Sequence, residues 1–420
     1  MNYVFIFPSI CNIGGAQLYL LNKMNYLTQK DWNVIVLYAR KDKILFNELK
    51  KYENNSIIEL QYSTCYYTKK HVEEVVNKSC KIILNSIDDN DDIVIESSTV
   101  SNASWAELIA RQLKCKHICF DFEEVFRYLS KSQLEFMYFK YKRNELRGIT
   151  NDSLTLMFKD FVDIKPDVKN RYRAIPIPII QNINNNYSEL LKKYDIVIGS
   201  IGRLDKEFVY PSLLEIQKYI IENSTKSYAI ILIGDSRDKK YKDKIRQLFN
   251  NIADLYITGE MFPISRQLIH QINVFISSSG SASATAREGI PTISVSPVTM
   301  KANGILNYTT KSSVISDVEI SYNVSELLFE VLNNKFCELN PNLKMYENYK
   351  ENFEKLCNEE FEKQINIALI NNIDSYYDIF KIKRSGIRHY LSIISKLLGY
   401  KNFHRIIYLA TKIKGTLVKG

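Results

Sequence analysis

The feature that most constrains the fold of this chain is a buried strand, a glycine turn and a helix, a pattern that occurs twice. In the first copy the strand is Tyr3–Phe7, Gly14 and Gly15 form the turn, and the helix covers Leu18–Leu27. The second copy begins at Ile196. Glycine in such a turn lets the phosphates of a ligand approach the backbone N–H groups at the start of the helix. The repeat predicts two similar domains with a phosphorylated ligand between them.

Length and element order set the expected domains. At 420 residues the chain exceeds the size that one core usually supports. Short buried strands alternate with helices in both halves, which predicts an α/β fold with two parallel sheets. Pro176 and Pro178, followed by the asparagine-rich stretch 182–186, mark a linker. We expect one α/β domain at 1–182, a second at 183–345, closing helices at 346–380 and a helical basic tail at 381–420.

The second half is predicted to contain short buried strands at Ile196–Ile201, Tyr228–Ile233, Asp254–Ile257, Val274–Ser277 and Thr292–Val295. Glycine or serine lies at the end of the first four. Ligands of parallel sheets bind outside the carboxyl ends of the strands. Those ends carry Gly202-Arg203, Gly234-Asp235, Gly259-Glu260 and Ser277–Ser281. Their agreement predicts one polar site along this edge of the second sheet.

The last forty residues carry a charge of +10, against a net charge of +9 for the whole chain, so the first 380 residues are nearly neutral. Residues 381–420 contain ten Lys or Arg and no Asp or Glu. Helical spacing relates six apolar residues of this tail: Tyr390, Leu391, Ile393, Ile394, Leu397 and Leu398. Apolar residues such as Leu397, Phe403 and Ile406 are interleaved with the basic ones. A nucleic-acid contact or a disordered end are alternatives, but nucleic-acid binding would leave the apolar positions unexplained. We expect residues 381–420 to contact an anionic membrane surface, and we expect no nucleic-acid partner.

Cysteine spacing and the N-terminus bear on the expected location. The seven cysteines include no CxxC pair, as is typical of reduced thiols in a cytosolic protein without a zinc motif. The N-terminal apolar stretch lacks a basic leader and a small-residue cleavage site, which predicts a strand rather than a signal peptide. No apolar run approaches the roughly 20 residues of a membrane-spanning helix. These features predict a cytoplasmic protein, peripheral on the inner face of the cell membrane.

Several segments in a characteristic order carry a family resemblance. They are Phe7–Gln17, Ile201–Lys206, Ile231–Asp235, Tyr256–Gly259 and the triplet Gly289-Ile290-Pro291 before the last strand of the second half. In these segments the chain resembles a GT-B glycosyltransferase, most closely the large retaining family that builds bacterial cell-surface polysaccharides such as capsule. The resemblance covers about residues 1 to 345.

The resemblance implies a fold and an activity. It implies two Rossmann-like domains facing a central cleft, an acceptor domain at 1–182 and a nucleotide-sugar donor domain at 183–345. It also implies transfer of a sugar from a nucleotide-sugar donor to a lipid-linked or growing cell-surface glycan. The anomeric configuration would be retained, and no cofactor would be required.

The chain departs from the family at one functional segment. The family usually has two glutamates seven residues apart before the Gly-x-Pro triplet. Here the stretch Ser277–Thr285 contains no carboxylate, and the next is Glu288. A catalytically silent GT-B-like module that binds a glycan or a partner enzyme is therefore one alternative, and a sugar-nucleotide epimerase is another.

Three residues are candidates for a role in the chemistry. The diphosphate leaving group gains negative charge during sugar transfer. A metal-free site can stabilise this charge with Arg, Lys and helix-terminal amides. Arg203 and Lys206 are the candidates for this task, with surface ion pairing as the alternative. His117 is the candidate base for the acceptor, although a lone histidine in a strand is more often structural.

The predicted donor-binding residues share a position at a turn or at a helix start. They are Gly14, Gly15, Gln17, Gly202, Ser279, Gly280, Ser281 and Glu288. Glycine turns and serine runs also occur for backbone reasons alone. Glu288 is the candidate to replace the missing ribose-binding carboxylate, with a solvated helix-end glutamate as the alternative. No metal site is predicted.

Overall fold

The computed structural model describes most of the chain. It describes residues 1–11, 13–39, 43–87, 92–122, 129–148, 151–166, 179–236, 238–311, 313, 321–341, 358–366, 369, 375–383, 387–399 and 402–403. The predicted linker at 176–178, residues 342–357 of the predicted closing helices and residues 404–420 of the predicted tail lie outside the described residues.

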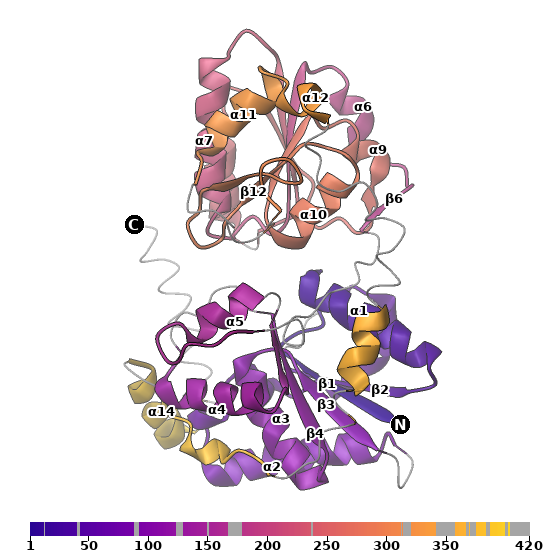
Figure 1. The fold of residues 1–420 in the computed structure, drawn as a ribbon, viewed down its shortest axis with the longest axis vertical. Coiled ribbons are helices and arrows are strands. Elements are labelled where there is room, and N and C mark those ends of the chain that lie inside the picture. The colour runs from indigo at the N-terminus through magenta and orange to yellow at the C-terminus, as the bar shows by residue number, and fades with distance from the viewer. Residues whose placement is uncertain are drawn as a thin grey trace. The chain divides into compact units, whose positions relative to one another are not determined.

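The chain divides into two compact units (Figure 1). The first unit consists mainly of Met1–Asn12, Ala16–Ile175 and Leu356–Gly420, and the second unit mainly of Pro176–Lys355. The C-terminal segment therefore belongs to the first unit, although the whole second unit separates it from that unit along the chain.

The first unit has five parallel strands in the order β2-β1-β3-β4-β5. They are β1 (Asn2–Phe7), β2 (Asn33–Tyr38), β3 (Ile93–Ser97), β4 (Lys116–Asp121) and β5 (Leu146–Gly148). The helices are α1 (Gly15–Gln29), α2 (Lys69–Leu84), α3 (Val100–Leu113), α4 (Lys131–Lys142) and α5 (Asn151–Phe158). This is a doubly wound order, as the alternation of elements predicts.

Local capping explains where several helices begin. Thr99 caps α3 by accepting from the backbone N–H of Asn102 at 3.2 Å. Ser130 and Gln133 form a capping box at the start of α4. Between β2 and α2 the chain runs through three short 3-10 turns, η1 (Asn47–Asn55), η2 (Ile58–Gln61) and η3 (Thr64–Tyr66), which the sequence pattern does not predict.

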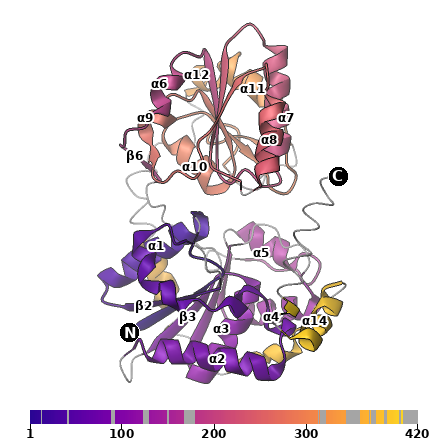
Figure 2. The same cartoon turned by 180° about the vertical axis from the view of Figure 1, so that it is seen from behind.

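Helices cover both faces of the first sheet (Figures 1 and 2). The helical residues 358–366 lie beside α1. The ring centroid of Phe361 lies 5.8 Å from that of Tyr19 and 5.5 Å from that of Tyr26. On the other face, α2 and α3 pack on the strands through one apolar core that includes Val75, Ile109 and Ile95.

The second unit has six strands in the order β13-β12-β11-β7-β8-β9. They are β7 (Ile196–Ile201), β8 (Tyr228–Ile233), β9 (Asp254–Ile257), β11 (Val274–Ser277), β12 (Thr292–Val295) and the antiparallel edge strand β13 (Ala302–Ile305). A separate pair joins β6 (Ile180–Gln181) to β10 (Ile264–Ser265). The helices are α6 (Tyr187–Leu191), α7 (Val209–Glu222), α8 (Lys239–Leu248), α9 (Arg266–Ile269), α10 (Ser279–Arg287), α11 (Val324–Leu332) and α12 (Phe336–Leu339).

Alternate residues of each buried strand supply the two cores of the second unit. In β8, Ile230 belongs to the core beneath α7, α8 and α11, whereas Ile231 belongs to the core beneath α6, α9 and α10. Figure 2 shows these two groups of helices on opposite faces of the sheet. The bounds predicted for β7, β8, β9, β11 and β12 agree with the structure. A strand buried on both faces has a continuous apolar sequence, as β8 does.

Part of the predicted tail packs on the first unit. The short turn η6 (Ile379–Lys381) and the helix α14 (Ile387–Leu398) follow one another along it. The backbone carbonyl of Lys383 accepts from Ser130 Oγ at 2.5 Å and from Ser132 Oγ at 3.0 Å. Across the described residues, no helix has the length and apolarity needed to cross a membrane.

Candidate functional site

The order of the second sheet reverses between β7 and β11. The chain proceeds from β7 outward through β8 and β9 on one side, and through β11 and β12 on the other. Such a reversal opens a crevice at the carboxyl ends of the two central strands, because the following loops run in opposite directions. Here the two ends are joined by a hydrogen bond from the backbone N–H of Ile201 to Ser277 Oγ at 3.2 Å.

The loops after β7 and β8 approach each other through two glycines. The backbone N–H of Gly202 donates to the carbonyl of Ile233 at 3.0 Å, and that of Leu204 donates to the carbonyl of Asp235 at 3.0 Å. Gly234 has φ +154°, and a Cβ there would lie 1.9 Å from the carbonyl oxygen of Gly202. Only glycine fits this approach. A Cβ on Gly202, by contrast, would meet nothing within 4 Å.

The serine-rich segment forms the start of α10, as the sequence predicts for a helix behind a buried strand. Ser277 is fully buried at the end of β11, Ser279 and Ser281 are half-buried, and Gly280 is exposed. The backbone N–H of Ser279 donates to the carbonyl of Ser313 at 2.6 Å. A Cβ on Gly280 would meet nothing within 4 Å. The Ser279 amide is thus engaged by Ser313, whereas the start of α10 borders open space at Gly280, an arrangement suited to an anion.

Two basic side chains follow β7. Arg203 is 67 % exposed, and its Nε lies 3.8 Å from Asp205 Oδ1. Lys206 Nζ lies 5.6 Å from the ring centroid of Phe208. The surface pairing of Arg203 is long and solvated, so it holds the guanidinium only weakly. The guanidinium can turn toward an anion at the carboxyl edge.

Glu288 lies at the opposite end of α10 from the serines. It follows Arg287 as the C-cap, so at 1.5 Å per residue it is about 13 Å along the helix from Ser279. Its carboxylate receives two bonds from Arg266, Nε to Oε2 at 2.9 Å and Nη2 to Oε1 at 3.2 Å. His270 Nε2 lies 3.3 Å from the same Oε2. The structure places Glu288 in this ion pair and does not bring it to the serine segment.

The first glycine turn lies between β1 and α1. Gly15 is the first residue of α1, Gly14 precedes it, and a Cβ on Gly15 would meet nothing within 4 Å. Gln17 is buried, and its Nε2 donates to the backbone carbonyl of Ser9 at 2.6 Å. Gln17 thus fixes the turn rather than projecting from it.

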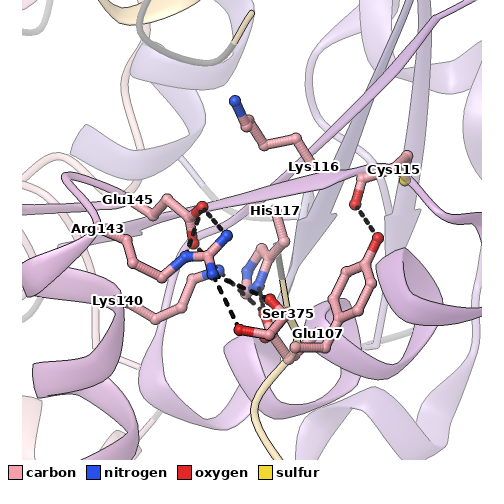
Figure 3. Close-up of a pocket in the computed structure, with 9 residues that line it drawn as sticks. Glu107, Cys115, Lys116, His117, Lys140, Arg143, Glu145 and Ser375 are labelled. Carbon is pink, nitrogen blue, oxygen red and sulfur yellow. Dashed lines mark hydrogen bonds and ion pairs between the residues drawn. The ribbon is translucent and has the colours of Figure 1, made fainter. Parts of the chain in front are cut away.

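His117 is enclosed in the core of the first unit (Figure 3). Its Nδ1 lies 2.7 Å from Glu107 Oε2, and its Nε2 lies 2.9 Å from Ser97 Oγ. Lys140 reaches the same Glu107 oxygen at 3.0 Å and Glu145 Oε2 at 2.6 Å. Both ring nitrogens therefore have partners, and His117 would have to break one of these bonds to accept a proton from an acceptor.

Burial and neighbouring charges hold this cluster in one charge state. Burial, assisted by Lys140, lowers the pKa of His117 to about 4. Burial raises the pKa of Glu107, but the charge of Lys140 and the hydrogen bond from His117 outweigh it and hold that pKa well below its usual range. The cluster therefore contains a neutral imidazole and an ionised carboxylate near neutral pH.

The cavity beside His117 is too small for a sugar. Its volume is about 10 Å³, room for a single water at most. The C-terminal segment closes it, since Arg143 Nη1 donates to the carbonyl of Ser375 at 3.1 Å and the backbone N–H of Tyr377 donates to Glu107 Oε1 at 2.9 Å. Figure 3 shows Arg143, Glu145 and Ser375 around His117.

A second buried cluster was missed by sequence reasoning. Lys23 and Glu96 are both fully buried, and Lys23 Nζ lies 2.6 Å from Glu96 Oε2. Tyr3 donates its hydroxyl to the same carboxylate oxygen at 2.6 Å, and Lys23 donates to Gln364 Oε1 at 3.2 Å. Burial lowers the pKa of Lys23. Lys23 and Glu96 are 73 residues apart in the sequence, so no local sequence pattern predicts the pair.

Comparison with known proteins shows which fold the chain shares with solved structures. No protein-family profile matches the chain, and no curated protein matches its sequence. A glycosyltransferase from Rickettsia africae is similar over 90 % of this chain and 98 % of its own, with 14 % identity and a TM-score of 0.59. Anabaena HepE, solved in complex with UDP, is similar over 88 % and 98 %, with 12 % identity and a TM-score of 0.54.

A third neighbour is the lipopolysaccharide outer core galactosyltransferase WaaB. It is similar over 88 % of this chain and 99 % of its own, with 13 % identity and a TM-score of 0.51. At these identities the likeness shows the fold alone. The chain has a GT-B-like fold, with two units that each contain a Rossmann-like, mainly parallel sheet.

Proposed function

We propose that this protein is a glycosyltransferase that moves a sugar from a nucleotide-sugar donor to a lipid-linked or growing cell-surface glycan on the cytoplasmic face of a membrane, with retention of configuration. The crevice where β7 and β11 diverge carries this proposal. There Gly202 and Gly280 border open space, and the first turn of α10 supplies amide groups. HepE, a structural neighbour, was solved with UDP, which supports a uridine nucleotide as the donor carrier.

The proposed chemistry needs charge stabilisation more than a base. Transfer breaks the bond between the anomeric carbon and the diphosphate and forms a bond from that carbon to an acceptor hydroxyl. The hydroxyl proton leaves with the diphosphate. Arg203, Lys206 and the α10 amides would stabilise the charge that grows on the leaving group. His117 has no place in this proposal, because Glu107 and Ser97 already engage its ring.

The first experiment measures binding of UDP and of a panel of UDP-sugars by calorimetry and by thermal shift, since a ligand that binds only the folded state raises its stability. Gly280→Val fills the open space beside α10, and Ser283→Val is a matched control on the same helix. We expect Gly280→Val to abolish UDP binding and Ser283→Val to preserve it. Equal UDP affinity in both variants would place the nucleotide elsewhere.

One observation favours a second candidate, a catalytically silent binding module. The α10 segment carries no carboxylate before Glu288, and Glu288, which pairs with Arg266, lies at the other end of α10 from the serines. Measuring the consumption of the donor distinguishes these candidate functions. A transferase consumes donor when an acceptor glycan is present, an epimerase converts donor alone, and a silent module binds donor without consuming it.

A further inference from the structure

The helix α14 packs on the first unit with its polar side. Ser392 and Ser395 are its most buried described residues, and Ser395 Oγ donates to the backbone carbonyl of Tyr66 at 2.6 Å. Leu391 lies at the edge of the apolar core, and the nearby Phe403 stacks on Tyr66 with ring centroids 5.8 Å apart. These contacts fix which side of α14 points toward the body.

The opposite side of α14 is apolar and faces solvent. We call it the α14 outer face, and it consists of Tyr390, Ile393, Ile394, Leu397 and Leu398. Leu397 is 79 % exposed and Tyr390 66 % exposed. At 100° per residue these five positions occupy one continuous stripe of the helix. A helix of a globular protein normally buries such a stripe. In α14 the opposite holds, because the polar side packs on the first unit and the apolar side faces solvent.

The basic residues near the α14 outer face indicate what kind of surface would cover it. Lys396 is exposed beside the stripe on α14, and Lys383 is exposed on the segment before the helix. Along the sequence, residues 381–420 carry ten basic residues and no acidic one. An apolar stripe bordered by cations matches the two layers of an anionic leaflet, in which acyl chains lie beneath phosphate headgroups. An apolar protein partner would match the stripe but would leave the cations unexplained.

We propose that the α14 outer face docks the protein on an anionic lipid surface. The apolar side chains enter the boundary between headgroups and acyl chains, and the flanking lysines contact lipid phosphates. The helix lies in the plane of the membrane, about 18 Å long for its 12 residues. This inference is independent of the proposed transferase activity, because it concerns a helix of the first unit, whereas the proposed nucleotide site lies in the second.

The test uses the full chain and two kinds of vesicle, phosphatidylcholine alone and phosphatidylcholine mixed with phosphatidylglycerol. The variant is Ile393→Ser/Leu397→Ser. The matched control is Ile221→Ser, a change at an apolar residue of α7 that is 57 % exposed. We expect the wild type and Ile221→Ser to sediment with the anionic vesicles, and the double variant to bind them at least about tenfold more weakly. Added salt should release the wild type.

Three results would overturn the inference. They are unchanged vesicle binding in the double variant, equal binding of the wild type to neutral vesicles, and a wild-type dimer that the double variant converts to monomer without vesicles. The last result would mean that two copies cover the face. Because the substituted side chains are exposed, both variants should unfold at the wild-type temperature. UDP affinity measured in parallel separates a failure of this inference from a failure of the proposed function.

Discussion

The polar groups of the two units differ in whether partners inside the protein already occupy them. In the first unit, Lys23, Glu96, Glu107 and His117 are buried, and each bonds to other side chains of the core. In the second unit, the loop after β7 and the start of α10 border open space at the sheet edge. Groups that are already paired hold a fold together, whereas amides beside open space can accept a ligand. The comparison assigns stability to the first set and binding to the second.

The largest effect is expected from Lys23→Met, which leaves Glu96 as a buried charge without its cation. We expect the free energy of unfolding to fall by about 3–5 kcal/mol in denaturant titration, because a buried charge that loses its partner remains desolvated. The control is Lys30→Met, since the Lys30–Glu362 pair is 45 % and 55 % exposed and should contribute little to stability. Equal losses of unfolding free energy in Lys23→Met and Lys30→Met would contradict the assignment of stability to the buried groups of the first unit.

Acid should weaken the first unit through His117. The imidazole is held neutral in the folded state, with a pKa of about 4, against 6.5 for an ordinary histidine. The unfolded chain therefore binds the proton first, and stability falls by up to about 3 kcal/mol as pH drops from 6.5 to 4. Glu107, whose pKa is lowered, adds a further loss below its ordinary 4.5.

The variant His117→Gln isolates the contribution of the imidazole. Its stability at neutral pH will be lower, but its slope against pH between 6.5 and 4 should be shallower than that of the wild type. Identical slopes in urea titrations across this range would show that His117 does not titrate as its surroundings indicate.

In the second unit, Gly234→Ala tests the close approach of two loops. A Cβ would lie 1.9 Å from the carbonyl oxygen of Gly202, so the loops must separate, and we expect a loss of about 2–3 kcal/mol together with weaker UDP binding. Gly259→Ala is the control: its φ of +76° is strained for alanine, but nothing lies within 4 Å. It should lose about 1 kcal/mol. Thermal unfolding and calorimetry measure both quantities.

The smallest stability effect, and a clear binding effect, is expected from Arg203→Ala. The side chain is 67 % exposed, so unfolding should change by less than about 0.5 kcal/mol. The affinity for UDP should fall about tenfold, as one charge-assisted contact to a diphosphate is lost. Arg246→Ala, at an arginine that is 55 % exposed and paired with Asp243 on α8, should leave the affinity unchanged. Wild-type affinity for UDP in Arg203→Ala would remove Arg203 from the proposed site.

Sequence reasoning predicted elements whose signal is local. The bounds of β7 and β8 follow from continuous apolar runs, and the glycines after them mark the sheet edge. The edge strand β13 was missed, because Ala302–Ile305 contains Asn and Gly and has no strand signal of its own. It pairs with β12 only after the chain has turned back.

Sequence reasoning could not place residues whose partners are distant along the chain. Glu288 was expected at the donor site, but Arg266 holds it at the far end of α10, 22 residues away in sequence. His117 was a candidate base, and its ring is engaged by Glu107 and Ser97. Which side chains meet in a core depends on how helices dock on the sheet, which no local pattern encodes.

The sequence by itself determined the α/β alternation, the glycines at the strand ends and the apolar stripe of α14, because strand, turn and helix periodicities are properties of neighbouring residues. Only the tertiary structure decided that Gly202 and Gly234 approach each other closely, that Lys23 and Glu96 form a buried pair in the first unit, and that α14 turns its apolar side outward. Those outcomes depend on burial and on contacts between residues far apart in the chain, where packing and desolvation decide which groups remain open to a ligand.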